Sequence, residues 1–162
     1  MKNILALLLI LLVPAINAYE KPTASNVSYG KHERNVMDIW QAKSTEKTPV
    51  MIFFHGGAFK MGDKKQINYF FDVKSYLKNG ITVISANYMF LKHTKNSYHK
   101  IMQDSEKILG VIKKNATKWN IDITKIAVTG CSAGTLIAEW WGYKAKMKIS
   151  AMGVVMQPMG SE

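Results

Sequence analysis

The sequence predicts an α/β fold, in which a mainly parallel β-sheet carries helices on both faces. Several short apolar runs are bounded by turn residues, a pattern typical of strands buried on both sides of a parallel sheet. These runs alternate along the chain with longer segments whose apolar residues recur at helical spacing. The 162 residues, of which 48% are hydrophobic and 20% charged, suit one globular domain or part of one.

The first 18 residues are expected to lie outside this fold. Lys2, an apolar stretch from Ile4 to Val13, and small residues up to Ala18 have the anatomy of a secretory signal peptide. A membrane anchor is the alternative, but the apolar stretch is shorter than the ~20 residues that span a bilayer. We therefore expect cleavage after Ala18, a mature domain over residues 19–162, no stable membrane span, and a secreted or periplasmic location.

The domain is expected to begin with a hairpin and to continue as alternating strands and helices. Short apolar stretches with a polar turn between them indicate two strands, near residues 27–29 and 36–40. Five consecutive apolar residues, Val50 to Phe54, indicate a buried strand that ends at a glycine turn. The later elements are predicted as helix 64–80, strand 81–88, helix 98–119, strand 125–130, helix 133–143 and strand 149–157. This order implies parallel strands joined by helical crossovers.

The charge is strongly positive but does not indicate a nucleic-acid partner. The net charge is +11, from 22 basic and 11 acidic residues, and Arg34 is the only arginine. Nucleic-acid readers depend on arginine for two-pronged contacts with phosphates and bases, whereas the lysines here are scattered along the chain. We interpret them as a solvated surface. Cys131 is the only cysteine, which excludes an intrachain disulfide, and we interpret it as a small core residue.

A candidate nucleophile, Ser132, lies in the segment Gly-Cys-Ser-Ala-Gly, residues 130–134. A serine hydroxyl is a weak nucleophile unless it is held exposed beside a base, and the Gly-x-Ser-x-Gly turn between a strand and a helix holds it in this way. The pattern here follows a predicted strand and opens a predicted helix. Ala133 would add a backbone N–H at the helix start, where donors are unpaired. No motif indicates a metal or another cofactor.

A second candidate site is the segment His-Gly-Gly-Ala-Phe, residues 55–59, which ends the Val50–Phe54 strand. Two consecutive glycines let the backbone direct its N–H groups at a ligand, and such donors can stabilise a developing oxyanion. Alone, the segment would be interpreted as a simple glycine turn. Its place upstream of the Ser132 turn, in the same series of strands and helices, favours an oxyanion hole.

Together these motifs resemble the α/β-hydrolase fold, and within it the serine esterases and lipases related to hormone-sensitive lipase. The resemblance spans residues 27–157. It adds "SANY" at 85–88, Asp104 early in a helix, and a "D-x-x-K-I" segment, Asp122 to Ile126, that leads into the strand before the Ser132 turn, which is called the nucleophile elbow. It implies an esterase with a serine acyl-enzyme, no cofactor, and a small-molecule or carbohydrate-linked ester as substrate. The residue roles that it implies are Ser132 as nucleophile, Gly56, Gly57 and Ala133 as oxyanion-hole donors, and His55 and Asp104 as structural residues.

The chain departs from this family after the elbow. In this fold the acid and the histidine of the triad follow the serine, but all four histidines here precede Ser132. We therefore expect the N-terminal part of a hydrolase domain, truncated after the elbow and lacking the triad acid and base. An exposed edge strand near residues 149–156 could then self-associate or pair with a complementing C-terminal fragment. A base from His93 or His99 is the alternative within the chain.

Two other functions compete with ester hydrolysis. The segment "VTGCSAGTL" superficially resembles the "T-G-x-x-x-G" turn of a nucleotide-binding oxidoreductase, but Leu136 occupies the expected third glycine position. That turn also normally follows the first strand of its domain, and this one follows several. The other alternative is a catalytically inactive remnant or binding module that keeps the hydrolase half-fold.

Overall fold

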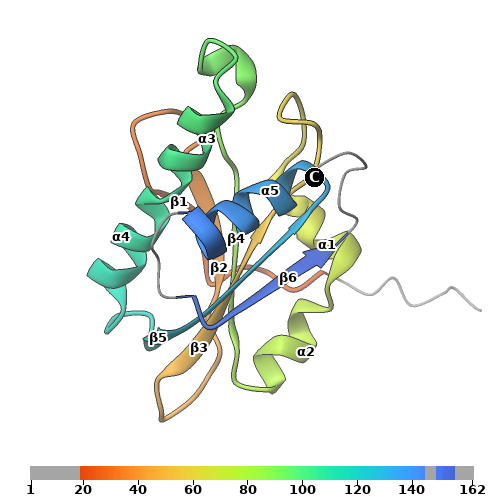
Figure 1. The fold of residues 1–162 in the computed structure, drawn as a ribbon. Helices are drawn as coiled ribbons and strands as arrows, with labels where there is room; N and C mark the ends of the chain where they lie inside the picture. The colour runs from red at the N-terminus through yellow and green to blue at the C-terminus, as the bar shows by residue number, and fades with distance from the viewer. Residues whose placement is uncertain (1–18, 145–148, 156–162) are drawn as a thin grey trace, which may run out of the picture.

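The computed structural model describes residues 19–144 and 149–155, which form one six-stranded sheet flanked by helices (Figure 1). The predicted signal peptide, residues 1–18, and the end of the last predicted strand, residues 156–157, lie outside the described residues. The strands are β1 (Ala24–Ser28), β2 (Val36–Trp40), β3 (Thr48–Phe54), β4 (Thr82–Ala86), β5 (Ile121–Cys131) and β6 (Ala151–Val155). The helices are η1 (Lys64–Gln66), α1 (Ile67–Phe70), α2 (Val73–Lys78), η2 (Leu91–His93), α3 (Tyr98–Ser105), α4 (Lys107–Asn115), α5 (Ala133–Glu139) and the π-helical η3 (Trp140–Lys144).

The strand order is β1-β2-β4-β3-β5-β6, and the sheet is mainly parallel as predicted. β1 and β2 form the predicted antiparallel hairpin, and β2 also runs antiparallel to β4. β3 pairs in parallel with both β4 and β5, and β5 pairs in parallel with β6. The last residue of β3, Phe54, is in register with Ala86 of β4 and Gly130 of β5. The carboxyl ends of three strands therefore meet at one edge of the sheet, where ligands of open α/β sheets bind.

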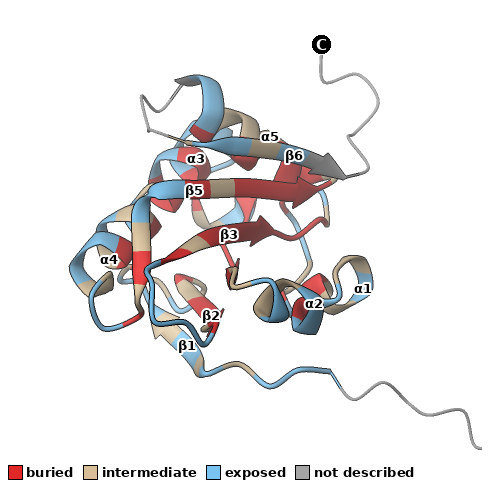
Figure 2. Cartoon of the chain, turned by 90° about the horizontal axis from the view of Figure 1, so that it is seen from below, coloured by how far each residue is buried: buried red, intermediate tan, exposed pale blue. Residues whose placement is uncertain are grey.

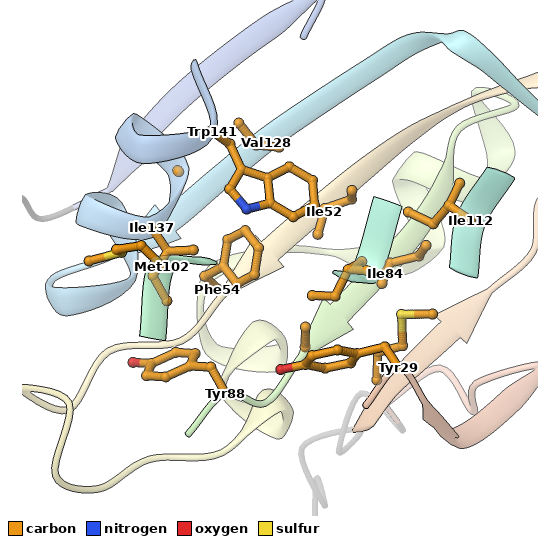
Figure 3. Close-up of a cluster of buried hydrophobic side chains, with 14 of the residues drawn as sticks. Tyr29, Ile52, Phe54, Ile84, Tyr88, Met102, Ile112, Val128, Ile137 and Trp141 are labelled. Atoms are coloured by element: carbon orange, nitrogen blue, oxygen red, sulfur yellow. The ribbon is translucent and has the colours of Figure 1, made fainter. Parts of the chain in front are cut away.

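Both faces of the sheet are covered, which explains the continuous apolar runs. Alternate residues of β3 point to opposite faces, so Ile52 and Phe54 join one core cluster while Met51 and Phe53 join another. The first cluster packs under α3, α4 and α5, with Trp141 edge-on to Phe54 at a ring-centroid distance of 5.5 Å (Figure 3). The second packs under α1 and α2 on the other face. Buried residues are concentrated along β3 and the last part of β5 (Figure 2).

The predicted helix 64–80 is instead three short helices, η1, α1 and α2. The chain is extended at Phe71, with φ −135° and ψ 134°. Asp72 then begins α2 as its N-cap, because its side chain accepts a hydrogen bond from the Ser75 N–H. Asp side chains compete for backbone donors in this way, which favours a cap over a helix interior. The predicted helix 98–119 is likewise divided, into α3 and α4, at Glu106.

β5 is longer than predicted, because it begins at Ile121, which is in register with Thr48 of β3. Ser132 follows the last residue of this strand directly. Among the helices of the described residues, none is long and apolar enough to cross a membrane.

Candidate active site

Ser132 occupies the predicted tight turn between β5 and α5. Its backbone has φ 49° and ψ −120°, an unfavourable conformation for a residue with a side chain. A strained serine at the end of a strand is the geometry of a nucleophile elbow. The helix that follows approaches the sheet closely, since a Cβ on Gly134 would lie 2.1 Å from the carbonyl oxygen of Phe54. Glycine is therefore required at this position.

The loop after β3 lies directly against this elbow, so the structure brings the two predicted sites together. A Cβ on Gly56 would lie 3.3 Å from the Cβ of Ser132 and 3.1 Å from the carbonyl oxygen of Cys131. Gly57 has φ 117°, and its carbonyl oxygen accepts hydrogen bonds from the N–H groups of Lys60 and Met61. The absence of side chains at both glycines permits this close turn.

The Gly56 N–H, predicted as an oxyanion donor, is engaged by a side chain in this structure. That N–H donates to Oε1 of Gln66, at 3.1 Å, so it is not free to bind a ligand beside Ser132. Gly56 serves the site through its missing side chain, which lets the loop approach the serine. Among the described residues, the backbone N–H groups of Gly57 and Ala58 have no acceptor.

Ala58 is a site residue that sequence reasoning missed. It lines the same cavity as Ser132 and has φ 52°, and the next residue, Phe59, has φ 56°. Two consecutive non-glycine residues in the left-handed region have no clear sequence signal. The burial of the Phe59 ring and the hydrogen bond from the Leu91 N–H to the Phe59 carbonyl, at 2.9 Å, hold this conformation.

The cavity at Ser132 has a volume of about 380 Å³ and a mainly apolar wall. Phe59, Tyr98 and Leu136 form this wall, and Ala133 lies beside the serine at the start of α5. The first N–H groups of a helix have no acceptor within it, so the Ala133 N–H is suited to an anion. The arrangement can hold an apolar group next to the Ser132 hydroxyl and to backbone donors.

His55 is completely buried and occupies a structural position, as predicted. Its Nδ1 lies 2.6 Å from the Gly56 carbonyl oxygen, and its Nε2 lies 3.2 Å from Nη2 of Arg34. The ring stacks on Tyr88 at a centroid distance of 4.2 Å, and the Tyr88 hydroxyl donates to the His55 carbonyl. Burial is the main cause that lowers the pKa of His55 to about 4. A neutral histidine with both nitrogens engaged is not a general base.

The remaining histidine candidates do not contact Ser132. Nδ1 of His93 accepts a hydrogen bond from the Phe90 N–H, and the His99 ring packs edge-on against Trp140 at 5.1 Å. Within the described residues, the Ser132 hydroxyl has no hydrogen-bond partner among side chains, and the backbone carbonyl of Ser132 accepts a hydrogen bond from the Thr135 hydroxyl. The predicted structural role of Asp104 holds, because this buried carboxylate accepts from Nδ2 of Asn35 and pairs with Lys107. In residues 19–144 and 149–155, no three His, Cys, Asp or Glu side chains are grouped to hold a metal.

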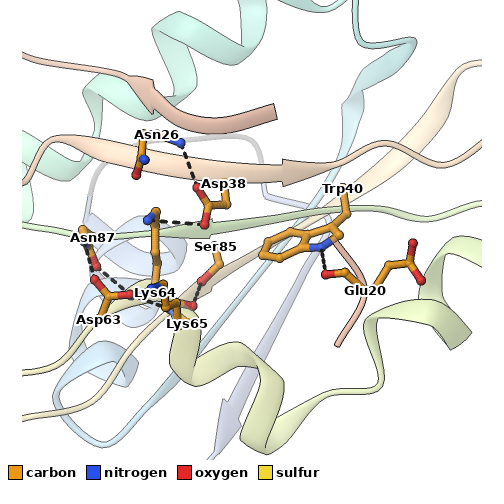
Figure 4. A network of polar contacts seen from close by, with 9 residues as sticks. All are labelled: Glu20, Asn26, Asp38, Trp40, Asp63, Lys64, Lys65, Ser85 and Asn87. Carbon is orange, nitrogen blue, oxygen red and sulfur yellow. Dashed lines mark hydrogen bonds and ion pairs between the residues drawn. The ribbon is translucent and has the colours of Figure 1, made fainter. Parts of the chain in front are cut away.

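A polar network fixes the segment that follows the glycine loop (Figure 4). The Lys64 ammonium lies 3.3 Å from the buried Asp38 carboxylate of β2, and the Lys64 backbone binds Asn87 and Ser85. Asn87 also donates to Asp63 at 3.0 Å. Burial alone would raise the pKa of Asp63, but hydrogen bonds, from Asn87 above all, hold that pKa below its usual value. The network joins the loop to β2 and β4.

Cys131 is a small core residue, as predicted. Its thiol joins the core cluster of Met51 and Phe53, on the sheet face under α1 and α2. Burial raises the pKa of the Cys131 thiol, which disfavours the reactive thiolate. The residue therefore packs as a small apolar side chain.

Residues 37–157 match the protein family BD-FAE. The chain is 30% identical over 121 residues to Esterase LipC of Mycobacterium tuberculosis, covering 74% of this chain and 29% of that protein. It is 28% identical over 114 residues to Gut esterase 1 of Caenorhabditis elegans, covering 66% of this chain and 20% of that protein. The chain thus spans less than a third of the length of either relative.

Solved structures share the fold. MGS-M1, an α/β hydrolase enzyme from a Medee basin deep-sea metagenome library, superposes with a TM-score of 0.67 at 24% identity, covering 81% of this chain and 55% of that one. A truncated form of a carbohydrate esterase from gut microbiota superposes with a TM-score of 0.64 at 26% identity, covering 80% and 45%. The mainly parallel sheet with helices on both faces is therefore that of an α/β hydrolase.

Proposed function

The chain belongs to the BD-FAE family, and we propose that it is a carboxylic ester hydrolase whose nucleophile is Ser132. The observation that carries this proposal is the meeting of a strained serine elbow with a glycine loop at one apolar cavity. Esterases among its relatives support the reaction class. The sequence motifs support the placement of the chain, among the α/β hydrolases, in the branch related to hormone-sensitive lipase.

In the proposed reaction the Ser132 hydroxyl attacks the carbonyl carbon of the ester. The carbonyl oxygen becomes an oxyanion, which the N–H groups of Gly57, Ala58 and Ala133 stabilise. The C–O bond to the alcohol then breaks, the alcohol leaves with a proton, and an acyl-enzyme remains. Water attacks the acyl-enzyme to release the acid and restore Ser132.

The reaction requires a base that takes the Ser132 proton and returns it to the leaving alkoxide. We propose that this base and its acid partner lie outside these 162 residues. The positions of the histidines support this, since none of the four follows Ser132 and both nitrogens of His55 are engaged. The oxyanion donors alone would give only a residual rate enhancement.

The proposed substrate is an ester of a small or medium acyl group, either a free small molecule or one attached to a carbohydrate. The volume and apolar wall of the cavity at Ser132 support an acyl or alkyl group of modest size. A structural neighbour described as a carbohydrate esterase supports the carbohydrate-linked form. The leader-like sequence of residues 1–18 supports a secreted or periplasmic location.

Chemical rescue tests this function without the missing base. Hydrolysis of p-nitrophenyl acetate would be measured with increasing imidazole for the wild-type chain and for Ser132→Ala. We expect imidazole to accelerate the wild type more than the variant, because it can take the serine proton. Equal rates for both proteins at every imidazole concentration would reject Ser132 catalysis and favour the inactive remnant or binding module.

A further inference from the structure

We propose that Arg34 is a positioning residue that fixes the proton of His55 on Nδ1 and thereby orients the Gly56–Gly57 peptide of the oxyanion hole. This inference rests on the serine hydrolase function proposed above. Arg34 lies in the β1–β2 loop, in a part of the sequence that carries neither the nucleophile nor the glycine motif.

The Arg34 side chain joins three loops. Its Nε donates to the Tyr88 carbonyl at 2.8 Å, in the segment after β4. Its Nη2 donates to the Gly62 carbonyl at 3.1 Å and lies 3.2 Å from Nε2 of His55, both in the loop after β3. The guanidinium also lies over the Phe90 ring, 3.7 Å from the ring centroid. This set of contacts uses the planar, forked donor geometry of arginine, which lysine cannot reproduce.

These contacts select one tautomer of His55. A guanidinium is only a donor, so the Nε2 that faces Arg34 must be an acceptor without a proton. The opposite nitrogen, Nδ1, faces a carbonyl oxygen, which is only an acceptor, so Nδ1 must carry the proton. The two bonds require the same neutral tautomer, and a proton on Nε2 would instead point at a cation.

The tautomer matters because the hydrogen bond from Nδ1–H to the Gly56 carbonyl fixes the orientation of the Gly56–Gly57 peptide unit. In a trans peptide the carbonyl oxygen and the next N–H point in opposite directions. The bond from His55 to the Gly56 carbonyl therefore directs the Gly57 N–H away from the His55 ring. That N–H has no acceptor among the described residues, and it is one of the proposed oxyanion donors. Arg34 thus acts on the reaction through His55, without touching the substrate.

The packing leaves little room for another arrangement of this peptide. Gly62 has φ 107°, and a Cβ there would lie 2.3 Å from the Gly56 carbonyl oxygen and 2.5 Å from Nδ1 of His55. The Tyr88 hydroxyl holds the His55 carbonyl at 2.7 Å. The ring and the backbone are both fixed, so only the position of the proton on the ring can change. The Gly56 carbonyl favours a proton on Nδ1, and Arg34 adds to this preference because it excludes a proton from Nε2.

Nitrogen-15 NMR of the histidine side chains tests the inference directly. In the wild-type chain at neutral pH we expect His55 to carry its proton on Nδ1. His32 and His93 should carry theirs on Nε2, because their Nδ1 atoms accept backbone N–H groups. In Arg34→Met only the Gly56 carbonyl still favours Nδ1, so we expect a measurable share of His55 to carry its proton on Nε2 and the Gly57 amide signal to shift, with His99 unchanged. A His55 that keeps the wild-type tautomer and Gly57 amide signal in Arg34→Met would overturn the proposal.

Two further variants separate positioning from general stability. Arg34→Lys retains a cation and a donor, so the variant should fold. Its share of His55 with the proton on Nδ1 should lie between those of Arg34→Met and the wild type. It also serves if Arg34→Met does not fold, and an Arg34→Lys spectrum without any change would contradict the need for the guanidinium fork. Lys31→Met removes an exposed cation from the same loop and should leave the His55 signals unchanged.

Kinetics provide the second readout. For the imidazole-rescued, Ser132-dependent reaction, Arg34→Met should lower kcat roughly 10-fold or more and leave KM nearly unchanged, since the loss is confined to the transition state. A rise in KM with unchanged kcat would contradict a positioning role. If the wild type shows no Ser132-dependent rate, the proposed function fails, and the tautomer measurement still decides the role of Arg34.

Discussion

Gly130 and Gly134 are packed against each other across the nucleophile elbow, so that a Cβ on Gly130 would lie 2.2 Å from the backbone carbonyl carbon of Gly134. The two glycines stand on either side of Ser132, at the end of β5 and in the first turn of α5. Neither has a φ that excludes other residues. The requirement for glycine here is therefore one of space between strand and helix, rather than of backbone conformation.

Gly130→Ala is expected to destabilise the fold by about 3 kcal/mol or more, because the backbone it meets cannot move aside. The matched control is Gly110→Ala in α4, where a Cβ would have no atom within 4 Å. That change should stabilise the chain by up to ~1 kcal/mol through helix propensity. Urea unfolding measures both, and a Gly130→Ala chain as stable as the wild type would contradict the packing described.

Gly62→Ala should abolish the imidazole-rescued, Ser132-dependent esterase rate. Its Cβ would enter the space of the hydrogen bond between His55 and Gly56. Gly80→Ala is the control, because Gly80 also has a positive φ, 72°, but a Cβ there meets nothing within 4 Å. Gly80→Ala should lower the free energy of unfolding by the backbone strain alone, ~1–2 kcal/mol, and should leave the esterase rate unchanged. Equal loss of rate in both variants would point to strain instead of collision.

Lys64→Met should destabilise the chain by roughly 3–5 kcal/mol, because it leaves the buried Asp38 carboxylate without its partner. Replacing both residues, as Lys64→Met with Asp38→Leu, should recover part of that loss. Lys125→Met removes an exposed partner of Asp122 and should change the free energy of unfolding little. Chemical denaturation of the wild type, Lys64→Met, Asp38→Leu and the double variant would measure the coupling, and additive effects of the two buried changes would argue against an ion pair.

Acid should destabilise the fold through His55. Its folded pKa of about 4 lies below the usual value of 6.5, so the unfolded state binds more protons between these limits. The stabilisation is complete above pH ~6.5 and is lost as the pH falls through ~4, with a slope of up to ~1.4 kcal/mol per pH unit. Free energies of unfolding at several pH values would measure this slope. We expect this dependence of the free energy of unfolding on pH to disappear in His55→Asn and to persist in His99→Gln.

Cys131 should react slowly with a thiol reagent in the folded chain. Its thiol is buried against Met51 and Phe53, and burial raises its pKa, so both access and thiolate content are low. Labelling with iodoacetamide should be at least ~100-fold faster after denaturation, because reaction requires opening of the core. Equally fast labelling of native and denatured protein would place the thiol at the surface.

The sequence predicted the sheet well because its signals are local. The run Val50 to Phe54 is apolar throughout since β3 is covered on both faces, and the glycines at 130 and 134 mark the elbow in the pattern itself. The helix breaks at Phe71 and Glu106 were missed, because an N-cap at Asp72 and a single residue between α3 and α4, Glu106 with helical φ and ψ, leave the apolar spacing nearly intact.

The site was predictable only in part, because its remaining parts depend on long-range contacts. The role of the Gly56 N–H is decided by the side chain of Gln66, on a following helix. Asp38 is a charged residue within an apolar strand, which hints at a buried partner, but only the fold identifies that partner as Lys64. In the sequence, Arg34 served only as the single arginine that argues against a nucleic-acid partner. Its contact with His55 is visible only in the fold.

The position of β3 between β4 and β5 determines when its two edges can pair during synthesis. β3 and β4 can pair as soon as both have been synthesised, but Val50 of β3 finds its other partner, Ile126 of β5, much later in the sequence. At ~5–20 residues per second, the apolar β3 has one open edge for several seconds on the ribosome. Exposed strand edges of this kind recruit other chains. During this interval the edge of β3 is available for pairing with other chains, and the Ser132 elbow can form only when the interval ends.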